Sequence, residues 1–321
     1  MIRVACRLAS LAMIPVAAAC ANYGPTSVVE SADWSAGTSA HVTAVGALTR
    51  TFLVHIPPHR RVSQSGVTLP WPLVIVLHGS GGDAGTIEHQ SGMDSVADAQ
   101  RFLVAYPNGL GGEFGIFPSD WNAGSCCGAA ARDNIDDLGF ISALLKTVAV
   151  HVPLDARRVY VAGFSAGGYM AYRAGCELSA SIAAIGVVSG SLADDPCTPA
   201  KPVPLFAIHG TDDPEVSYDE PAPVPTGLVP ALASALPPAV QFWSALNGCS
   251  ALTAKGVQTA SAADVVQTNW TSCSAGDVDF YSIAGGTHGW PGGPDAPGAL
   301  PPMNEINASA LMWQFFIRHI R

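Results

Sequence analysis

A Gly-x-Ser-x-Gly segment carries the clearest chemical signal in the sequence. The segment Gly163-Phe164-Ser165-Ala166-Gly167 follows an apolar run typical of a buried strand and precedes a helical pattern. A serine at such a strand-to-helix turn has strained backbone and an exposed hydroxyl, and flanking glycines let neighbouring chain approach closely. The helix N-terminus that follows favours developing negative charge. We therefore expect Ser165 to act as a nucleophile, with an ordinary tight turn as the alternative interpretation.

A serine hydroxyl needs a base to remove its proton, and the base needs a carboxylate to orient it. His288 is the candidate base, because its Gly-rich segment directly follows the last expected strand and can curl over the end of a sheet. The acid should lie between the serine and the histidine in the sequence. Asp212 and Asp213 follow an earlier strand there, and only one of two adjacent side chains can face the base. We choose Asp213, with Asp212 as the alternative; turn capping is the non-catalytic explanation for either.

Such a nucleophile also needs backbone N–H groups that stabilise the oxyanion of a tetrahedral intermediate. One should be the N–H of Ala166, directly after the nucleophile. The second should come from the Gly-rich segment 77–82 after an early strand, where Ser80 is our candidate. These glycines also suggest a phosphate-binding loop, but the Lys-Ser/Thr pair of a P-loop is absent and the G-x-G-x-x-G spacing fails.

Three aromatic side chains are expected to border the substrate: Trp121, Trp290 and His78. Trp290 lies two residues after the candidate base, and flat aromatic faces suit sugar and hydroxyacyl chains. Ordinary core packing is the alternative for both tryptophans. The pair Asp136-Asp137 opens an expected helix, where N-terminal capping explains it better than metal binding does. We expect neither a metal nor a cofactor.

A series of short motifs runs in order along residues 46–321: Leu77-His78-Gly79, Tyr106-Pro107-Asn108-Gly109, Trp121-Asn122, Cys126-Cys127-Gly128, Asp136-Asp137-Leu138-Gly139-Phe140, Gly163-Phe164-Ser165-Ala166-Gly167-Gly168, His209-Gly210-Thr211-Asp212-Asp213, Asn247-Gly248-Cys249, His288-Gly289-Trp290-Pro291-Gly292 and Trp313-Gln314-Phe315-Phe316. This set resembles the esterase family of polyhydroxybutyrate depolymerases, whose relatives include feruloyl and acetyl xylan esterases and mycobacterial-type lipoprotein esterases. The resemblance implies an α/β-hydrolase fold, cleavage of carboxylic esters without a cofactor, and a catalytic triad on Ser165, Asp213 and His288. Two departures are Ser80, where some polyester depolymerases have cysteine, and a stretch at 221–238 that is longer than usual.

The elements that must position these residues alternate between strand and helix patterns. Apolar runs predict strands at Thr51–Ile56, Leu73–Leu77, Phe102–Tyr106, Val159–Ala162, Ile182–Val188, Val203–Ile208 and Val278–Ile283. Most runs are continuous, as in strands of a parallel sheet that are buried on both faces. Helical patterns cover Leu138–Val150, Ala166–Leu178, Ala239–Leu246 and Asn304–Ile320. The alternation predicts an α/β fold with a mostly parallel sheet flanked by helices.

The N-terminus has the anatomy of an export signal. Basic residues precede an apolar run of about twelve residues that ends at Ala19, shorter than the roughly twenty needed to span a bilayer. We therefore divide the chain into an export signal (1–19), a lead-in or tether (20–45) and one catalytic domain (46–321). Cys20 directly follows small residues, so lipid anchoring there is an open alternative to free secretion. We expect no transmembrane helix and a location outside the cytoplasm, in the cell envelope or the medium.

The net charge and the cysteine content indicate which binding partners and which cellular compartment suit the protein. Fifteen basic and twenty-five acidic residues give a net charge of −10, which opposes nucleic-acid binding and suits a small or oligomeric ester substrate. An even number of cysteines follows Cys20, which predicts disulfides in an oxidising compartment, and Cys249 with Cys273 is our best single pairing. The 221–238 stretch is Pro-rich and reads as a loop over the site or a passive insertion. Two other functions remain open: a serine peptidase with the same triad, and a non-catalytic binding lipoprotein.

Overall fold

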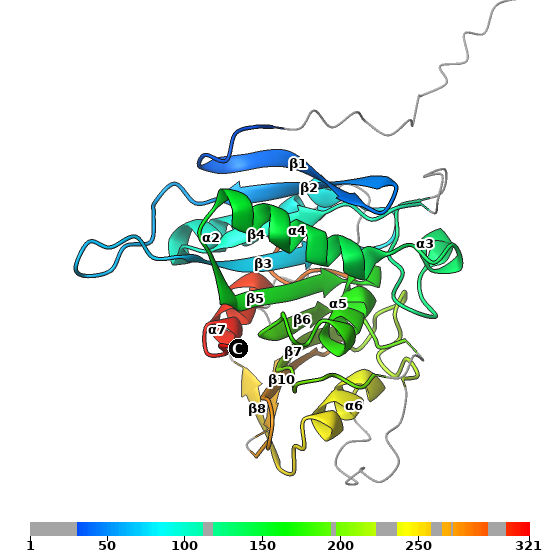
Figure 1. The fold of residues 1–321 in the computed structure, drawn as a ribbon. Coiled ribbons are helices and arrows are strands. Elements are labelled where there is room, and N and C mark those ends of the chain that lie inside the picture. The colour runs from blue at the N-terminus through cyan, green and yellow to red at the C-terminus, as the bar shows by residue number, and fades with distance from the viewer. Residues whose placement is uncertain are drawn as a thin grey trace, which may run out of the picture.

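The computed structural model describes residues 31–111, 118–193, 197–222, 236–257, 265–270, 272–294 and 306–321. The expected export signal, Cys20 and most of the 221–238 stretch lie outside these residues. The described chain forms one ten-stranded sheet in the order β1-β2-β4-β3-β5-β6-β7-β10-β9-β8 (Figure 1). The strands are β1 (Gly37–Val45), β2 (Leu48–Ile56), β3 (Trp71–Leu77), β4 (Leu103–Pro107), β5 (Leu154–Phe164), β6 (Ala184–Val188), β7 (Leu205–Gly210), β8 (Leu252–Val257), β9 (Val265–Trp270) and β10 (Val278–Ile283).

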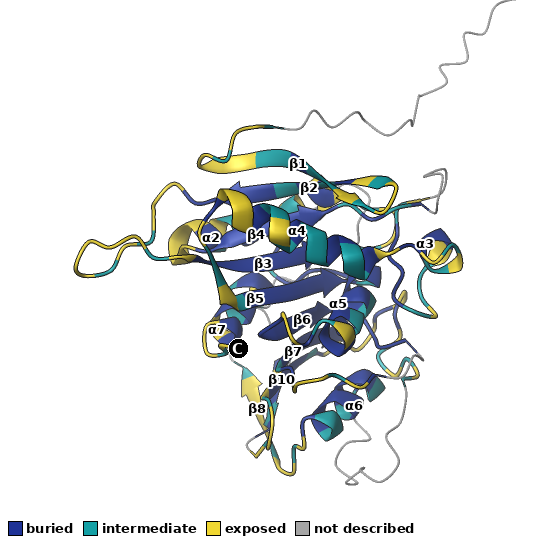
Figure 2. Cartoon of the chain, viewed as in Figure 1, coloured by how far each residue is buried: buried dark blue, intermediate teal, exposed yellow. Residues whose placement is uncertain are grey.

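The centre of the sheet is parallel and its edges are antiparallel. Neighbouring strands from β4 through β3, β5, β6 and β7 to β10 all run in the same direction. The outer strands β1, β2, β8 and β9 pair antiparallel. Every residue of β3, β4, β6 and β7 is buried, which explains the continuous apolar runs of these strands (Figure 2). The expected α/β fold class is confirmed.

Helices cover both faces of the sheet. They are α1 (Ala84–Ser91), α2 (Met93–Gln100), α3 (Gly128–Arg132), α4 (Asp137–His151), α5 (Ala166–Glu177), α6 (Pro238–Leu246) and α7 (Ala308–Phe316). One apolar cluster joins α4, α5 and α6 to the sheet, and a second joins α1, α2 and α7 to it (Figure 1). Because the central strands are parallel, their carboxyl ends meet at one edge, and loops after β3, β5, β7 and β10 emerge there together.

Some elements differ from the sequence-based expectation. The lead-in predicted to extend to residue 45 already contains β1, which pairs with β2 along its full length. Strands β1 and β8 are edge strands with only one buried residue between them, so they lack the apolar run that marks a buried strand. The last helix is shorter than the expected 304–320, since α7 is capped by Asn307 and ends at Phe316. None of the helices in the described part of the chain is long and apolar enough to cross a membrane.

Three disulfides join cysteines in the described chain: Cys126–Cys127, Cys176–Cys197 and Cys249–Cys273. The last pair is the one predicted from sequence, and it closes a 24-residue separation that contains the β8–β9 pair. The second pair ties α5 to the segment that follows β6. Such cross-links stabilise a fold mainly by restricting the unfolded chain.

Candidate active site

Ser165 occupies the turn between β5 and α5. Strand β5 ends at Phe164 and α5 begins at Ala166, which leaves Ser165 alone at the junction with φ 55° and ψ −122°. Its N–H donates to the Val188 carbonyl at 3.0 Å, and its own carbonyl accepts from the N–H groups of Gly168 and Tyr169. A non-glycine residue in this backbone region is strained, and strain of this kind clusters at functional sites. The side chain is half-buried rather than covered.

The glycines around Ser165 are required by space. A Cβ on Gly163 would overlap the carbonyl of Gly167, and a Cβ on Gly167 would overlap the carbonyl oxygen of Leu77. The turn therefore packs backbone against backbone with the loop that follows β3. That loop also reaches the serine itself, since a Cβ built on Gly79 would lie 3.2 Å from the Cβ of Ser165.

His288 and Asp213 are hydrogen-bonded to each other. The Nδ1 atom of His288 lies 2.8 Å from Oδ2 and 3.0 Å from Oδ1 of Asp213, although 75 residues separate them. Because a carboxylate only accepts, Nδ1 carries the proton and donates it, which leaves Nε2 free to accept. The Phe164 ring, next to Ser165 in the chain, packs on the His288 ring with centroids 4.7 Å apart. Strand topology accounts for the meeting, because β7 and β10 are parallel neighbours and both residues follow their carboxyl ends.

The Asp213 carboxylate is fully buried and held in its ionised form. Its Oδ1 accepts from the backbone N–H groups of Glu215 and Val216, both at 2.9 Å, and its Oδ2 lies 3.4 Å from Nε2 of His209. Burial alone would raise the pKa of Asp213, but hydrogen bonds from two histidines and a backbone N–H outweigh it and hold that pKa well below its usual range. Asp213 is therefore ionised at neutral pH where it contacts His288.

Backbone contacts between two loops decide which of the adjacent carboxylates faces His288. The N–H of Asp212 donates to the Gly286 carbonyl at 2.9 Å, and its side chain accepts from Thr211 Oγ1. Gly210 lies so close to Gly286 that a Cβ on Gly210 would overlap the Gly286 carbonyl. The loops after β7 and β10 therefore pack directly against each other. Asp213 is thus the carboxylate that contacts His288, whereas the Asp212 side chain contacts Thr211.

The two candidate oxyanion donors belong to the residue after Ser165 and to the loop that contacts Ser165. Ala166 is the first residue of α5, where backbone N–H groups have no partner within the helix. Ser80 is an exposed residue in the loop after β3, one residue from Gly79, which contacts Ser165. The Ser80 hydroxyl donates to Oδ2 of Asp120 at 3.1 Å. Sequence reasoning did not find Asp120, because no local pattern links it to a loop 40 residues earlier.

The three expected substrate contacts are buried instead. Trp121 is 0%, Trp290 1% and His78 1% exposed, so none presents surface to a ligand. Trp290 donates to Ser309 Oγ within the core beneath α7. Trp121 donates to the His78 carbonyl at 2.8 Å. These contacts give no support to the prediction that the three side chains border the substrate. Proximity to the candidate base in sequence does not say which way a large aromatic side chain points, and here all three are buried.

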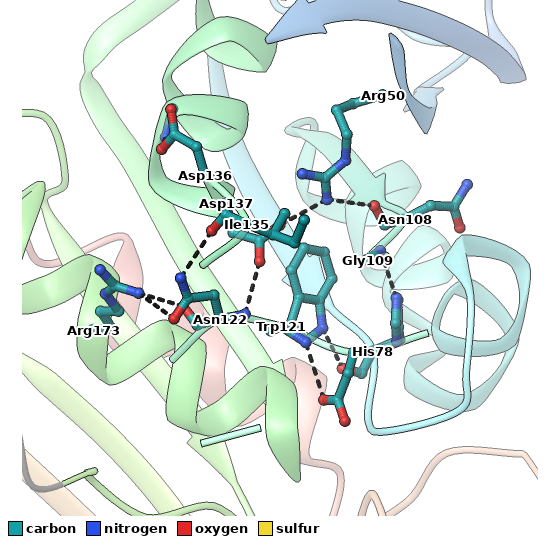
Figure 3. A network of polar contacts seen from close by, with 12 residues as sticks. Arg50, His78, Asn108, Gly109, Trp121, Asn122, Ile135, Asp136, Asp137 and Arg173 are labelled. Atoms are coloured by element: carbon teal, nitrogen blue, oxygen red, sulfur yellow. Dashed lines mark hydrogen bonds and ion pairs between the residues drawn. The ribbon is translucent and has the colours of Figure 1, made fainter. Parts of the chain in front are cut away.

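His78 is a neutral structural histidine. Its Nδ1 donates to the Gly79 carbonyl at 2.7 Å, and its Nε2 accepts from the Gly109 N–H at 2.9 Å (Figure 3). Burial lowers the pKa of His78 to about 4. The ring therefore braces the loop after β3 and takes no part in proton transfer at neutral pH.

A buried polar network extends behind the site (Figure 3). Arg50 of β2 donates to the Asn108 carbonyl and to Oδ1 of Asp137 at 2.7 Å. The other oxygen of Asp137 accepts from the N–H of Asn122, whose carbonyl and side chain accept from Arg173 on α5. Asp136 caps α4 as expected, but the buried ion pair of Asp137 has no local sequence signal. No cluster of potential metal ligands occurs among the described residues.

Comparisons with known proteins agree on one kind of enzyme. Residues 59–202 match the family model described as "Esterase PHB depolymerase". A relative from Nocardia uniformis subsp. tsuyamanensis, provisionally named esterase NocK, is 28% identical over 87% of this chain and 81% of its own. Feruloyl esterase C from Emericella nidulans is 27% identical over 77% of this chain and 78% of its own.

A solved structure shares the fold. The acetyl xylan esterase from Aspergillus awamori aligns with a TM-score of 0.53 and 13% identity, covering 75% of this chain and 89% of that one. At this identity the likeness concerns the α/β-hydrolase fold alone, while the family model and the relatives concern the activity. With this fold and these relatives, the chain is a carboxylic ester hydrolase, and over residues 59–202 it is similar to the polyhydroxybutyrate depolymerase-type esterases.

Proposed function

We propose that this esterase works through an acyl-enzyme, with Ser165 as nucleophile, His288 as base and Asp213 as the acid that orients the base. The observation that carries the proposal is the hydrogen bond at 2.8 Å between His288 Nδ1 and the buried, ionised Asp213. That bond leaves His288 Nε2 unprotonated and able to take a proton from a serine. The strained turn at Ser165, whose neighbour Phe164 packs on His288, supplies the serine.

The reaction then proceeds in two halves. Ser165 Oγ attacks the ester carbonyl while His288 takes its proton, and the resulting oxyanion accepts hydrogen bonds from the N–H groups of Ala166 and Ser80. His288 returns the proton to the departing alcohol, which leaves an acyl group on Ser165. Water attacks the acyl carbonyl while His288 takes its proton. His288 then returns that proton to Ser165 Oγ as the acyl C–O bond breaks and the acid leaves. Asp213 stays ionised throughout and stabilises the imidazolium that forms in each half.

We propose hydroxyacyl esters, such as hydroxybutyrate oligomers, as the substrate class. The match of residues 59–202 to the family described as "Esterase PHB depolymerase" supports this choice. Relatives named feruloyl esterase C and bifunctional acetylxylan esterase/xylanase favour a second candidate, esters of plant polysaccharide with ferulate or acetate. Export follows from the basic and apolar N-terminal segment, and anchoring through Cys20 is a further proposal that rests on sequence alone.

A product-resolved screen tests the function. Wild type, Ser165→Ala and a control, Ser181→Ala at an exposed serine, are assayed on hydroxybutyrate oligomers, methyl ferulate, acetylated xylan and peptide amides. We expect wild type and the control to release alcohol from esters in a burst, and Ser165→Ala to lose turnover on all of them. Unchanged turnover in Ser165→Ala contradicts the proposal. Faster cleavage of amides than of esters would make the protein a peptidase.

A further inference from the structure

We call the loop after β3, residues 78–82, the oxyanion loop because it carries Ser80. A neighbouring segment holds this loop in place. Three consecutive residues, Ser119, Asp120 and Trp121, each bond to it. The Ser119 carbonyl accepts from Gly81 N–H at 2.7 Å, the Asp120 carboxylate accepts from the Ser80 hydroxyl at 3.1 Å, and Trp121 Nε1 donates to the His78 carbonyl at 2.8 Å. Among these three contacts, only that of Asp120 reaches the side chain of Ser80 itself.

The Asp120 carboxylate is itself held in place. Its Oδ1 accepts from the N–H of Trp121 at 3.0 Å, and its backbone exchanges two hydrogen bonds with Leu110. Its Oδ2 lies close to Gly128, where a Cβ would be only 2.6 Å away, so a side chain at position 128 would displace the carboxylate. Burial raises the pKa of Asp120, and the Ser80 hydroxyl counters that rise. Asp120 itself is only 7% exposed, although the hydroxyl that it binds belongs to an exposed residue, Ser80.

We propose that Asp120 is a positioning residue that orients the Ser80 N–H toward the oxyanion formed at Ser165. This inference rests on the proposed function, in which that N–H is one of two oxyanion donors. The hydroxyl and the N–H of Ser80 share one Cα, so a carboxylate that holds the hydroxyl restrains the direction of the N–H as well. Because the oxyanion exists only in the transition state and the intermediate, loss of Asp120 lowers kcat and leaves KM nearly unchanged.

Steady-state kinetics of three variants on an activated ester test the proposal. We expect Asp120→Ala to lower kcat by about tenfold or more, less than the hundredfold typical for deletion of an oxyanion donor, with KM within about twofold. Asp120→Asn restores kcat, because an amide can accept from the Trp121 N–H and donate to the Ser80 hydroxyl. The matched control is Asp33→Ala, which removes a carboxylate that accepts from Ser35 Oγ at 2.9 Å on the exposed segment before β1. It leaves kcat unchanged.

A double-mutant cycle identifies the route through Ser80. Ser80→Ala removes the hydroxyl and keeps the N–H, so Asp120→Ala should lower kcat much less in that background than in wild type. Equal losses in both backgrounds, or wild-type kcat in Asp120→Ala, overturn the proposal. If Asp120→Ala does not fold, Ser80→Ala decides instead: full kcat there overturns the proposal. Loss of the proposed function looks different, because wild type and Ser165→Ala would then be equally inactive or equally active.

Discussion

The substitution Asp213→Asn tests the assignment of base and acid at a single atom. Oδ1 of Asp213 accepts from two backbone N–H groups, so the amide oxygen of asparagine would take that position and the NH₂ group would face His288. An NH₂ group donates, and Nδ1 of His288 would then have to accept. The imidazole proton moves to Nε2, where the imidazole can no longer remove the proton of Ser165.

The expected loss is large for so small a change. The same replacement in serine proteases, which traps the wrong tautomer, lowers kcat by about 10⁴-fold, or roughly 5.5 kcal/mol of transition-state stabilisation. We expect kcat to fall by about 10³- to 10⁴-fold here on an activated ester, measured at neutral pH with active sites counted by titration. Loss of charge-assisted hydrogen bonds should also lower the free energy of unfolding by about 1.5–3 kcal/mol.

The adjacent carboxylate supplies the control. Asp212→Asn removes a charge one residue away, but the Asp212 side chain contacts Thr211 and not His288. We expect its kcat to stay within about twofold of wild type. The reasoning is refuted if Asp213→Asn keeps more than a tenth of wild-type kcat while folded, or if Asp212→Asn loses as much.

Two further predictions concern stability. Burial raises the pKa of Glu88 from 4.5 to about 7, so between these pH values the folded chain keeps a proton that the unfolded chain releases. The free energy of unfolding should therefore fall as pH rises from about 4.5 to 7. For this half-exposed group we expect a fall on the order of 1 kcal/mol. Chemical unfolding of Glu88→Gln across that range should lack this part of the decline, and an identical pH profile contradicts the argument. A Cβ on Gly167 would overlap the Leu77 carbonyl oxygen, so Gly167→Ala should cost about 1–3 kcal/mol of stability and lower kcat by pushing the oxyanion loop away. Gly256→Ala, where a Cβ meets nothing within 4 Å, is its control, and equal thermal shifts in the two variants would disprove the packing argument.

Residues buried on both faces of the sheet account for most of what sequence could predict of the fold. The β3, β6 and β7 strands are continuous apolar runs because helices cover both of their faces. Edge strands such as β8 are mostly exposed and carry no such run, so they were missed. Helices α1 and α2 are eight residues each and have too few apolar positions to show a period.

At the candidate site, chain order and the positions of strand ends predicted that Asp213 and His288 meet. The sequence did not predict the direction in which individual side chains point. Asp213 could be told from Asp212 only by the contact with His288, since both follow β7. Trp290 lies two residues from His288 in sequence but points into the core. The contact of Asp120 with Ser80 spans 40 residues, and the ion pair of Arg50 with Asp137 spans 87. Long-range polar contacts of this kind leave no local pattern.

Covalent labelling of Ser165 is the most direct test of the central claim. A fluorophosphonate probe reacts with a serine only when a base activates it, so we expect one label per chain on the peptide that contains Ser165, with loss of esterase activity in proportion to labelling. Ser165→Ala should take up no label, and Asp213→Asn should take it up far more slowly. Labelling at another serine, or full ester turnover by a chain labelled at Ser165, would contradict the assignment of Ser165 as the nucleophile.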